Sequence, residues 1–189
     1  MKYAWVDTCC IDKSSSAELS ESINSMFKWY RQATTCYAYL EDVDTHDPAD
    51  FKSPDSSLSK SRWFRRGWTL QELVAPRNVT FYNAKWEKIG DKKDHVLELE
   101  AITGIDPDVL GGKAPQAVPI AWRMSWAADR ETTRIEDVAY SLLGIFDINM
   151  PLLYGEGPKP SYACRERSIA RLTTIASLRG ELSPASLML

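Results

Sequence analysis

The apolar residues of the chain recur at helical spacing between residues 16 and 32. The positions that share one face are Leu19, Ile23, Met26, Phe27 and Tyr30. Such spacing is typical of an amphipathic helix that buries one side. Ser15 and Glu18 stand at the spacing of a capping box, in which a hydroxyl and a carboxylate each satisfy a free backbone amide. We therefore predict a helix that begins after Ser15 and ends near Gln32.

Three short apolar and aromatic runs, at 2–6, 35–40 and 79–82, predict β-strands. The first two strands flank the predicted helix. A strand, a helix and a strand in this order favour a right-handed crossover and parallel pairing. The pattern therefore predicts an α/β fold.

Further helices are predicted at 62–74, where Pro76 ends the helix, at 96–102, which ends at Gly104, and at 121–128. A last helix is predicted over 135–146. Its expected buried residues are Val138, Ala139, Leu142, Leu143 and Phe146. The segment 41–60 is rich in Asp, Ser, Pro and Lys and has few apolar anchors, so we expect a flexible surface loop.

The composition is that of a globular protein with one core. Of the 189 residues, 44% are hydrophobic and 26% charged, and the net charge is −3, which gives no electrostatic pull toward nucleic acid. No apolar run approaches the roughly 18 residues that span a bilayer, and Asp7 interrupts the N-terminus before a signal sequence forms. We expect a cytoplasmic protein with no membrane span and no nucleic-acid partner.

Cysteine and histidine are too sparse and too scattered for a predicted metal site. Cys9 and Cys10 are adjacent, which does not match zinc-ligand spacing, and the two histidines, His46 and His95, stand apart. No metal or cofactor is therefore predicted. We expect reduced thiols, with Cys36 serving as a small apolar residue in a strand.

Several sequence blocks in fixed order resemble the fungal heterokaryon-incompatibility (HET) family. The blocks are Tyr3-Ala-Trp-Val-Asp7-Thr-Cys-Cys-Ile-Asp12, Cys36-Tyr-Ala-Tyr-Leu40, Arg62-Trp-Phe-Arg-Arg-Gly67-Trp-Thr-Leu-Gln-Glu72-Leu-Val-Ala-Pro76, Arg130-Glu-Thr-Thr-Arg134, Glu136-Asp-Val-Ala-Tyr140 and Asn149-Met-Pro-Leu-Leu-Tyr-Gly-Glu-Gly157. The resemblance covers nearly everything from residue 2 to residue 157. It implies a module for self/non-self recognition and programmed cell death that is activated by clustering.

The resemblance also implies partners and a more detailed fold. Family members self-associate and are typically followed by oligomerising nucleotide-binding and repeat regions. Their fold resembles that of TIR (Toll/interleukin-receptor) domains: a flavodoxin-like, mostly parallel sheet flanked by helices, here with additional helices toward the C-terminus. We expect a partial HET domain over residues 1–157 that lacks the family's first strand, followed by a divergent tail over 158–189. Our hypothesis is that a frameshift produced this tail, and the alternative is a tail that has diverged without one. An alternative to the signalling function is that the chain is a non-functional, truncated gene product.

The resemblance to TIR proteins directs attention to one carboxylate. Several of them cleave NAD⁺ with a glutamate in a Trp-x-Leu-x-Glu-Leu segment, and Trp68-Thr-Leu-Gln-Glu72-Leu matches it. A carboxylate can stabilise the oxocarbenium-like state of glycosidic cleavage. Glu72 is thus the candidate catalytic residue of an NAD⁺ nucleosidase, with NAD⁺ as substrate. The alternative is a structural ion pair with Arg65, Arg66 or Arg77.

Four further residues are candidates for substrate binding. Asp7 and Asp12 flank the loop after the first predicted strand, where α/β sheets bind ligands, and either could hold a ribose hydroxyl or simply cap a turn. Trp68 could stack on a flat ring or belong to the core. Arg66 could bind phosphate or lie on a solvated helix face.

Overall fold

The computed structural model describes residues 3–45 and 47–155, and its helices and strands are short except for one helix of 17 residues. The α-helices are α1 (Asp7–Cys10), α2 (Ser16–Gln32), α3 (Thr69–Val74), α4 (Val96–Thr103), α5 (Pro107–Leu110), α6 (Ile120–Ser125), α7 (Asp137–Tyr140) and α8 (Leu143–Phe146). The strands are β1 (Cys36–Tyr39), β2 (Val79–Tyr82) and β3 (Lys88–Asp91), and the 3-10 helices are η1 (Pro48–Lys52), η2 (Arg62–Arg65), η3 (Lys92–Asp94) and η4 (Pro115–Ala117). The predicted tail 158–189 lies outside the described residues.

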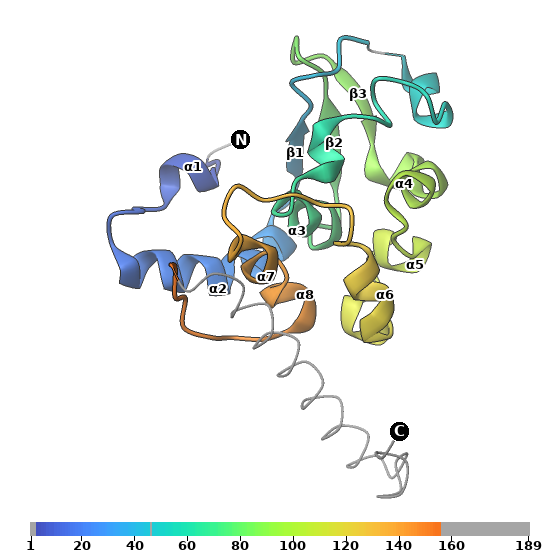
Figure 1. Ribbon diagram of the computed structural model, residues 1–189. Helices are drawn as coiled ribbons and strands as arrows, with labels where there is room; N and C mark the ends of the chain where they lie inside the picture. The colour runs from blue at the N-terminus through green and yellow to red at the C-terminus, as the bar shows by residue number, and fades with distance from the viewer. Residues whose placement is uncertain (1–2, 46, 156–189) are drawn as a thin grey trace, which may run out of the picture.

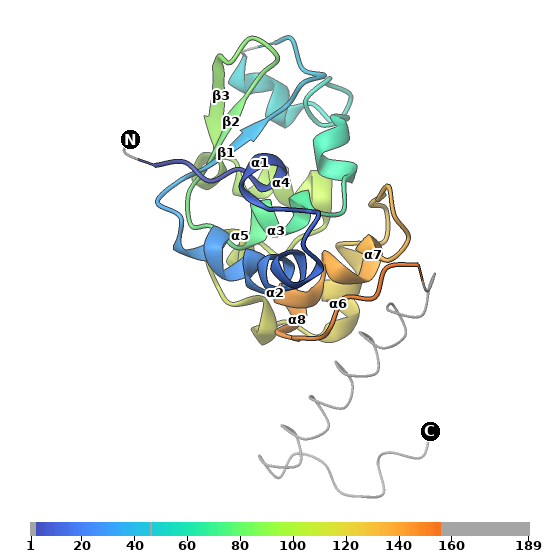
Figure 2. The ribbon, with the colours of Figure 1, turned by 90° about the vertical axis from the view of Figure 1, so that its left-hand side faces the viewer.

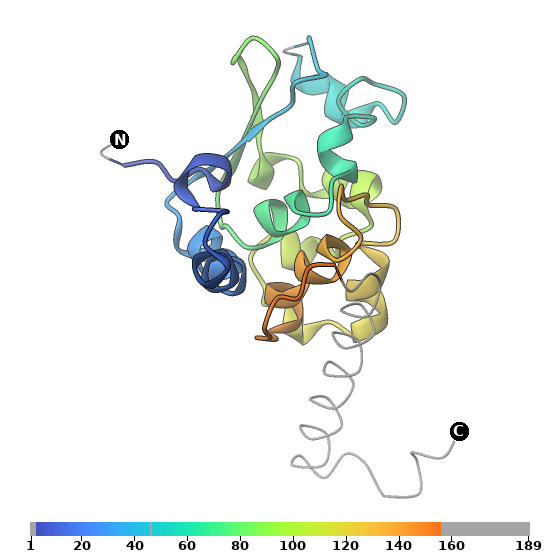
Figure 3. The ribbon, with the colours of Figure 1, turned by 60° about the vertical axis from the view of Figure 1, so that its left-hand side comes forward.

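The three strands lie toward one end of the molecule and most helices toward the other, with α3 near the centre (Figure 1). Helix α2 contacts both α3 and α8, and the three helices lie close together in the view of Figure 2. Helices α1 and α2 lie on the same side of the molecule (Figure 3). The α/β class predicted from the sequence is confirmed.

Helix α2 has the predicted limits, although its N-terminal cap is only half of a capping box. The Ser15 hydroxyl accepts a hydrogen bond from the Glu18 amide at 3.3 Å. The Glu18 carboxylate accepts one from the amide of Asp12 at 2.9 Å instead of the amide of Ser15. Glu18 thereby fixes the turn that enters the helix.

The first predicted strand is wrong, because residues 3–6 form no ladder and continue directly into α1. The Val6 carbonyl accepts the amides of Cys9 and Cys10 and so starts a helical turn. The Trp5 ring packs edge-on against Trp29 at 5.3 Å and Tyr30 at 5.5 Å between centroids. The N-terminal segment is therefore held by packing of Trp5 against α2 and not by pairing with a strand.

The sheet is mixed instead of mostly parallel. Strand β1 pairs with β2 in parallel, with Cys36 opposite Val79, whereas β2 and β3 are antiparallel. The connection between the two parallel strands, β1 and β2, runs through α3. The predicted connection was the preceding one, from residues 2–6 to residues 35–40 through α2. Cys36 is buried in its strand, as expected, and Tyr37 and Tyr39 point to the exposed side.

Strand β3 was not predicted, because its signal is a turn and not a run of apolar residues. The Asn83 side chain accepts the amides of Lys85 (3.0 Å) and Glu87 (2.9 Å), which closes the hairpin between β2 and β3. Trp86 takes a positive φ of 61° in this turn and stacks on Tyr39. A fully buried asparagine thus specifies the reversal of the chain.

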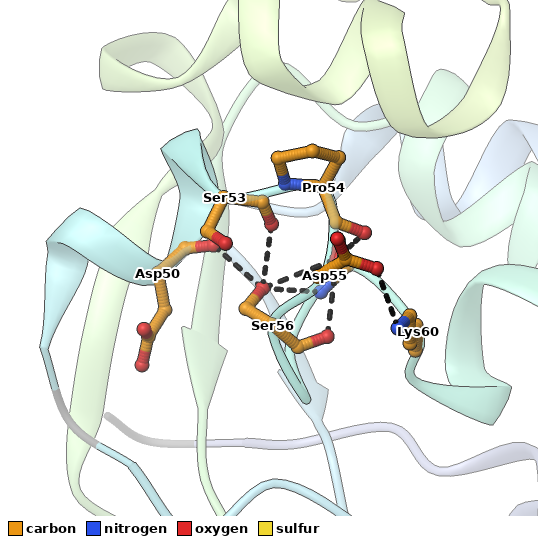
Figure 4. A network of polar contacts seen from close by, with 7 residues as sticks. Asp50, Ser53, Pro54, Asp55, Ser56 and Lys60 are labelled. Carbon is orange, nitrogen blue, oxygen red and sulfur yellow. Dashed lines mark hydrogen bonds and ion pairs between the residues drawn. The ribbon is translucent and has the colours of Figure 1, made fainter.

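The segment 41–60 is attached to the core more firmly than its composition suggests. The side chains of Val43, Phe51 and Leu58 are almost completely buried. Figure 4 shows the polar part of the segment, in which the Ser56 hydroxyl donates to the carbonyl oxygen of Asp50 at 2.7 Å. The few apolar residues of the segment therefore anchor it to the core, and its flexibility stays a prediction.

The predicted helices over 62–74 and 135–146 are each divided in two. The first becomes η2 and α3, and the second becomes α7 and α8. Val138, expected to be buried, is 39% exposed, whereas Leu142 and Phe146 are buried. Helix α8 approaches α2 so closely that a Cβ on Gly144 would overlap the Phe27 side chain, so this contact requires glycine.

No helix among the described residues is long and apolar enough to cross a membrane.

A lysine without a carboxylate partner among the described residues is buried beneath α3. The Lys92 side chain is 1% exposed, and its ammonium group donates to the carbonyl oxygens of Leu73 and Pro76. These carbonyls lie at the end of α3, where helical partners run out. Burial lowers the pKa of Lys92 from 10.5 to about 8.

We expect this lysine to make the protein relatively more stable as the pH rises. The folded state loses the proton near pH 8 and the unfolded chain near pH 10.5, so between them the unfolded chain binds more protons. Chemical unfolding at several pH values in this range measures the unfolding free energies of the wild type and of Lys92→Met. The wild-type value minus the variant value should increase with pH, by up to about 3 kcal/mol. A difference that does not change with pH would contradict the assignment.

Candidate functional site

Helix α3 begins where two distant segments pair through their backbones. The Gly67 amide donates to the Glu131 carbonyl at 2.8 Å, and the Glu131 amide donates to the Arg65 carbonyl at 2.6 Å. A Cβ on Gly67 would overlap the Thr132 side chain, so glycine is needed for the close approach. This pairing brings Arg130 to the start of α3.

The Arg130 side chain is half-buried against the N-terminal end of α3. Its Nε donates to the Trp126 carbonyl at 3.1 Å, and its Nη1 donates to the Arg66 carbonyl at 2.9 Å and to the Thr69 hydroxyl at 3.0 Å. Burial lowers the pKa of Arg130 to about 10, so the group is still charged at neutral pH. Among the described residues, its Nη2 finds no hydrogen-bond acceptor.

Glu72 lies in the first turn of α3 and is half-buried. Burial, and after it the negative charge of Asp7, raise the pKa of its carboxyl group to about 7. Arg66, the Tyr30 hydroxyl and Arg130 act in the opposite direction and favour the carboxylate. We call these five residues, Asp7, Tyr30, Arg66, Glu72 and Arg130, the Glu72 cluster.

The five members of the Glu72 cluster come from four separate segments, and Arg66 lies in the stretch directly before α3. Asp7 is in α1, Tyr30 in α2, Glu72 in α3 and Arg130 in the connection after α6. The Tyr30 hydroxyl favours the ionised form of Glu72, and burial together with the charge of Glu72 raises the pKa of Tyr30. Trp5, which packs on Tyr30, helps to hold the segment that carries Asp7.

The ion pair between Glu72 and an arginine, which was the alternative to a catalytic role, is not formed in the described part of the chain. No salt bridge within 4 Å joins Glu72 to Arg65, Arg66 or Arg77 there. Arg66 and Arg130 act on the carboxyl group from a longer range. A raised pKa near 7 is the opposite of what a tight arginine pair would produce, because an adjacent cation stabilises the charged form.

Two of the predicted binding residues are used elsewhere in the fold. The Asp12 carboxylate accepts the Ser14 amide at 2.9 Å and the Ser14 hydroxyl at 2.6 Å, and these bonds lower the pKa of Asp12. Asp12 thus stabilises the turn before α2, which is the turn-capping role that was the alternative to binding a ribose hydroxyl. Trp68 is half-buried and packs against the core at the N-terminus of α3.

Tyr30 and Arg130 are the members of the Glu72 cluster that the sequence analysis missed as site residues. Tyr30 was assigned to the buried face of α2, where a hydroxyl group has no separate signal. Arg130 was part of a family block, but nothing in the order of residues showed that it would reach α3. The long-range pairing of Gly67 with Glu131 places it there.

A hollow of about 380 Å³ lies beside Arg130. Phe64, Arg65, Trp126 and Asp129 line it together with Arg130, and Glu72 is not among its lining residues. The lining of the hollow therefore contains aromatic rings together with positively and negatively charged side chains. Arg130 is the residue that connects it to the Glu72 cluster.

Among residues 3–45 and 47–155, no group of three or more His, Cys, Asp or Glu side chains is arranged to hold a metal ion.

Comparison with known proteins identifies the family. The family model described as heterokaryon incompatibility protein (HET) matches residues 1–57. The vegetative incompatibility protein HET-E-1 of Podospora anserina is 48% identical over 174 residues, which are 90% of this chain. The chain belongs to the HET family. The identity extends far beyond the segment that the family model matches.

This HET chain spans about 12% of the length of HET-E-1. No solved structure matches it. The Glu72 cluster therefore has to be interpreted from its own geometry and charges.

We expect removal of the Glu72 charge to stabilise this HET domain above neutral pH. A carboxyl group whose pKa is raised from 4.5 to about 7 keeps its proton to a higher pH in the folded state than in the unfolded chain. The free energy of unfolding therefore decreases as the pH rises through this range. Glu72→Gln should match the wild type below pH 4.5 and exceed it above pH 7, by roughly 3 kcal/mol at most.

Thermal and urea unfolding at pH 4, 6 and 8 measure this difference. Glu21→Gln, on the exposed side of α2, is the matched control for the loss of one carboxylate. A Glu72→Gln variant that is less stable than the wild type at pH 8 would show that the carboxylate stabilises the fold.

Proposed function

We propose that this HET domain is a cytoplasmic signalling module of vegetative incompatibility that triggers programmed cell death when it is clustered. The observation that supports this most strongly is the 48% identity to a vegetative incompatibility protein over 90% of the chain. The partners are other HET domains and an oligomerising nucleotide-binding and repeat region that brings copies together.

A second candidate function is NAD⁺ hydrolysis through Glu72 by a TIR-like fold. The Glu72 cluster favours it because a half-buried carboxyl group with a pKa of about 7 is typical of functional sites and unusual for structural ones. The unpaired Nη2 of Arg130 offers a buried donor for an anionic substrate, because buried donors normally have an acceptor. Asp7 or Arg66 would bind the ribose or the phosphates.

The chemistry requires one ionised carboxylate. The bond between the ribose C1′ and the nicotinamide nitrogen breaks, and its electron pair goes to the nitrogen, so nicotinamide leaves as a neutral molecule. The Glu72 carboxylate stabilises the oxocarbenium-like ribosyl group. Water then adds to C1′ and releases a proton. Because only the ionised form helps, activity should rise with pH through the pKa of Glu72 near 7.

We expect induced clustering of this chain to kill fungal cells. The full chain is fused to a module that dimerises when a small molecule is added, and viability and cellular NAD⁺ are followed over time. The wild type and the Glu21→Gln control should kill after induction and remain harmless before it. Survival of cells that contain folded, clustered protein would contradict the signalling function.

Glu72→Gln in the same cells separates the two candidates. If Glu72 is catalytic, this variant should preserve NAD⁺ and viability while Glu21→Gln does not. Cell death with intact NAD⁺ in both variants would eliminate the hydrolase and leave the signalling function.

A further inference from the structure

A second hollow, of about 240 Å³, lies between α2, the end of α3 and the loop before η4. It is separate from the Glu72 cluster. Its apolar lining includes Phe27, Val74 and Pro115, all of which are buried. The first of these comes from α2, the second from α3 and the third from η4, so three parts of the chain share one apolar floor.

Three cations line the same hollow: Arg31, Arg77 and Lys113. All three are exposed, and no aspartate or glutamate is among the lining residues. The chain as a whole carries a net charge of −3, so the local excess of positive charge opposes the overall balance. Three like charges around one hollow repel each other, and a bound anion would relieve that repulsion.

Local structure accounts for only part of this arrangement. Arg31 is in the last turn of α2, where a cation complements the helix dipole. Lys113 pairs with Asp108 at 3.1 Å, but both side chains are largely solvent-exposed, and such pairs are weak. Within the described residues, no ion pair within 4 Å involves Arg31 or Arg77. Neither interaction explains why cations from three segments share one hollow.

The loop that carries Lys113 depends on a glycine. Gly112 has a φ of 109°, which side-chain-bearing residues rarely adopt, and its amide donates to the Val109 carbonyl at 3.0 Å. The backbone turns here so that the next residue reaches the hollow. The turn at Gly112 therefore sets the point at which Lys113 leaves the backbone beside the hollow.

We propose that this hollow binds a small soluble phosphomonoester whose ring or apolar part rests on the floor of Phe27, Val74 and Pro115. Guanidinium groups suit phosphate because their planar donors match its oxygens. The volume is below the roughly 300–1,000 Å³ of sites for larger ligands, so the hollow fits a sugar phosphate and not a dinucleotide. The proposal is independent of the role of Glu72.

Titration calorimetry of the full chain with ribose 5-phosphate tests the proposal. We expect saturable binding that weakens as salt is added, because charged groups carry much of it. Arg31→Gln and Arg77→Gln should each weaken binding by roughly tenfold. Lys28→Gln, an exposed position on the same helix that does not line the hollow, is the matched control and should bind like the wild type.

The unfolding temperature of each variant shows whether it is folded, and Gly112 is left unchanged for that reason. Inorganic phosphate should bind more weakly than ribose 5-phosphate, because it leaves the apolar floor uncovered. Equal binding of the two ligands, binding that survives both arginine substitutions, or no binding to the wild type would each overturn the proposal.

Discussion

The burial of the Glu72 carboxyl group beside Asp7 is the constraint on which the account of the site depends. Water stabilises a carboxylate strongly, and its partial removal disfavours the charged form. A second negative group adds to this cost, and the arginines of the cluster do not cancel it, because the pKa of Glu72 is still raised to about 7. The protein thus keeps a carboxyl group in an unfavourable place, which is typical of positions retained for function at the expense of stability.

The supporting structure explains why the Glu72 cluster is held in place. Pairing of Gly67 with Glu131 fixes the start of α3 and delivers Arg130 to it. Packing of Trp5 on Trp29 and Tyr30 fixes the segment that ends in Asp7. Each contact joins residues that are far apart in sequence. The cluster is therefore a property of the folded chain and is absent from any single segment.

This dependence on long-range contacts also decides what the sequence could predict. Helix α2 and the strands at 36–39 and 79–82 were predictable because their apolar periods are regular. Glu72 was found through the family resemblance. Asp7 was chosen because it follows a predicted strand that does not form, and Arg66 because of the charge that it could offer a phosphate, yet both act on the Glu72 carboxyl group. Strand β3 was missed because the signal is the side chain of Asn83, and the strand expected at residues 2–6 was wrong because Trp5 packs on a helix. Arg130 could not be found without knowledge of the pairing at Glu131.

A direct titration of the Glu72 carboxyl carbon by NMR tests the central claim. Glutamate labelled with ¹³C gives the resonance, and Glu72→Gln identifies it by its loss. The account predicts an apparent pKa of about 7 in the wild type and a lower value in Asp7→Asn, because one of the two causes is then removed. A wild-type value near 4.5, or a raised value that Asp7→Asn leaves unchanged, would contradict it.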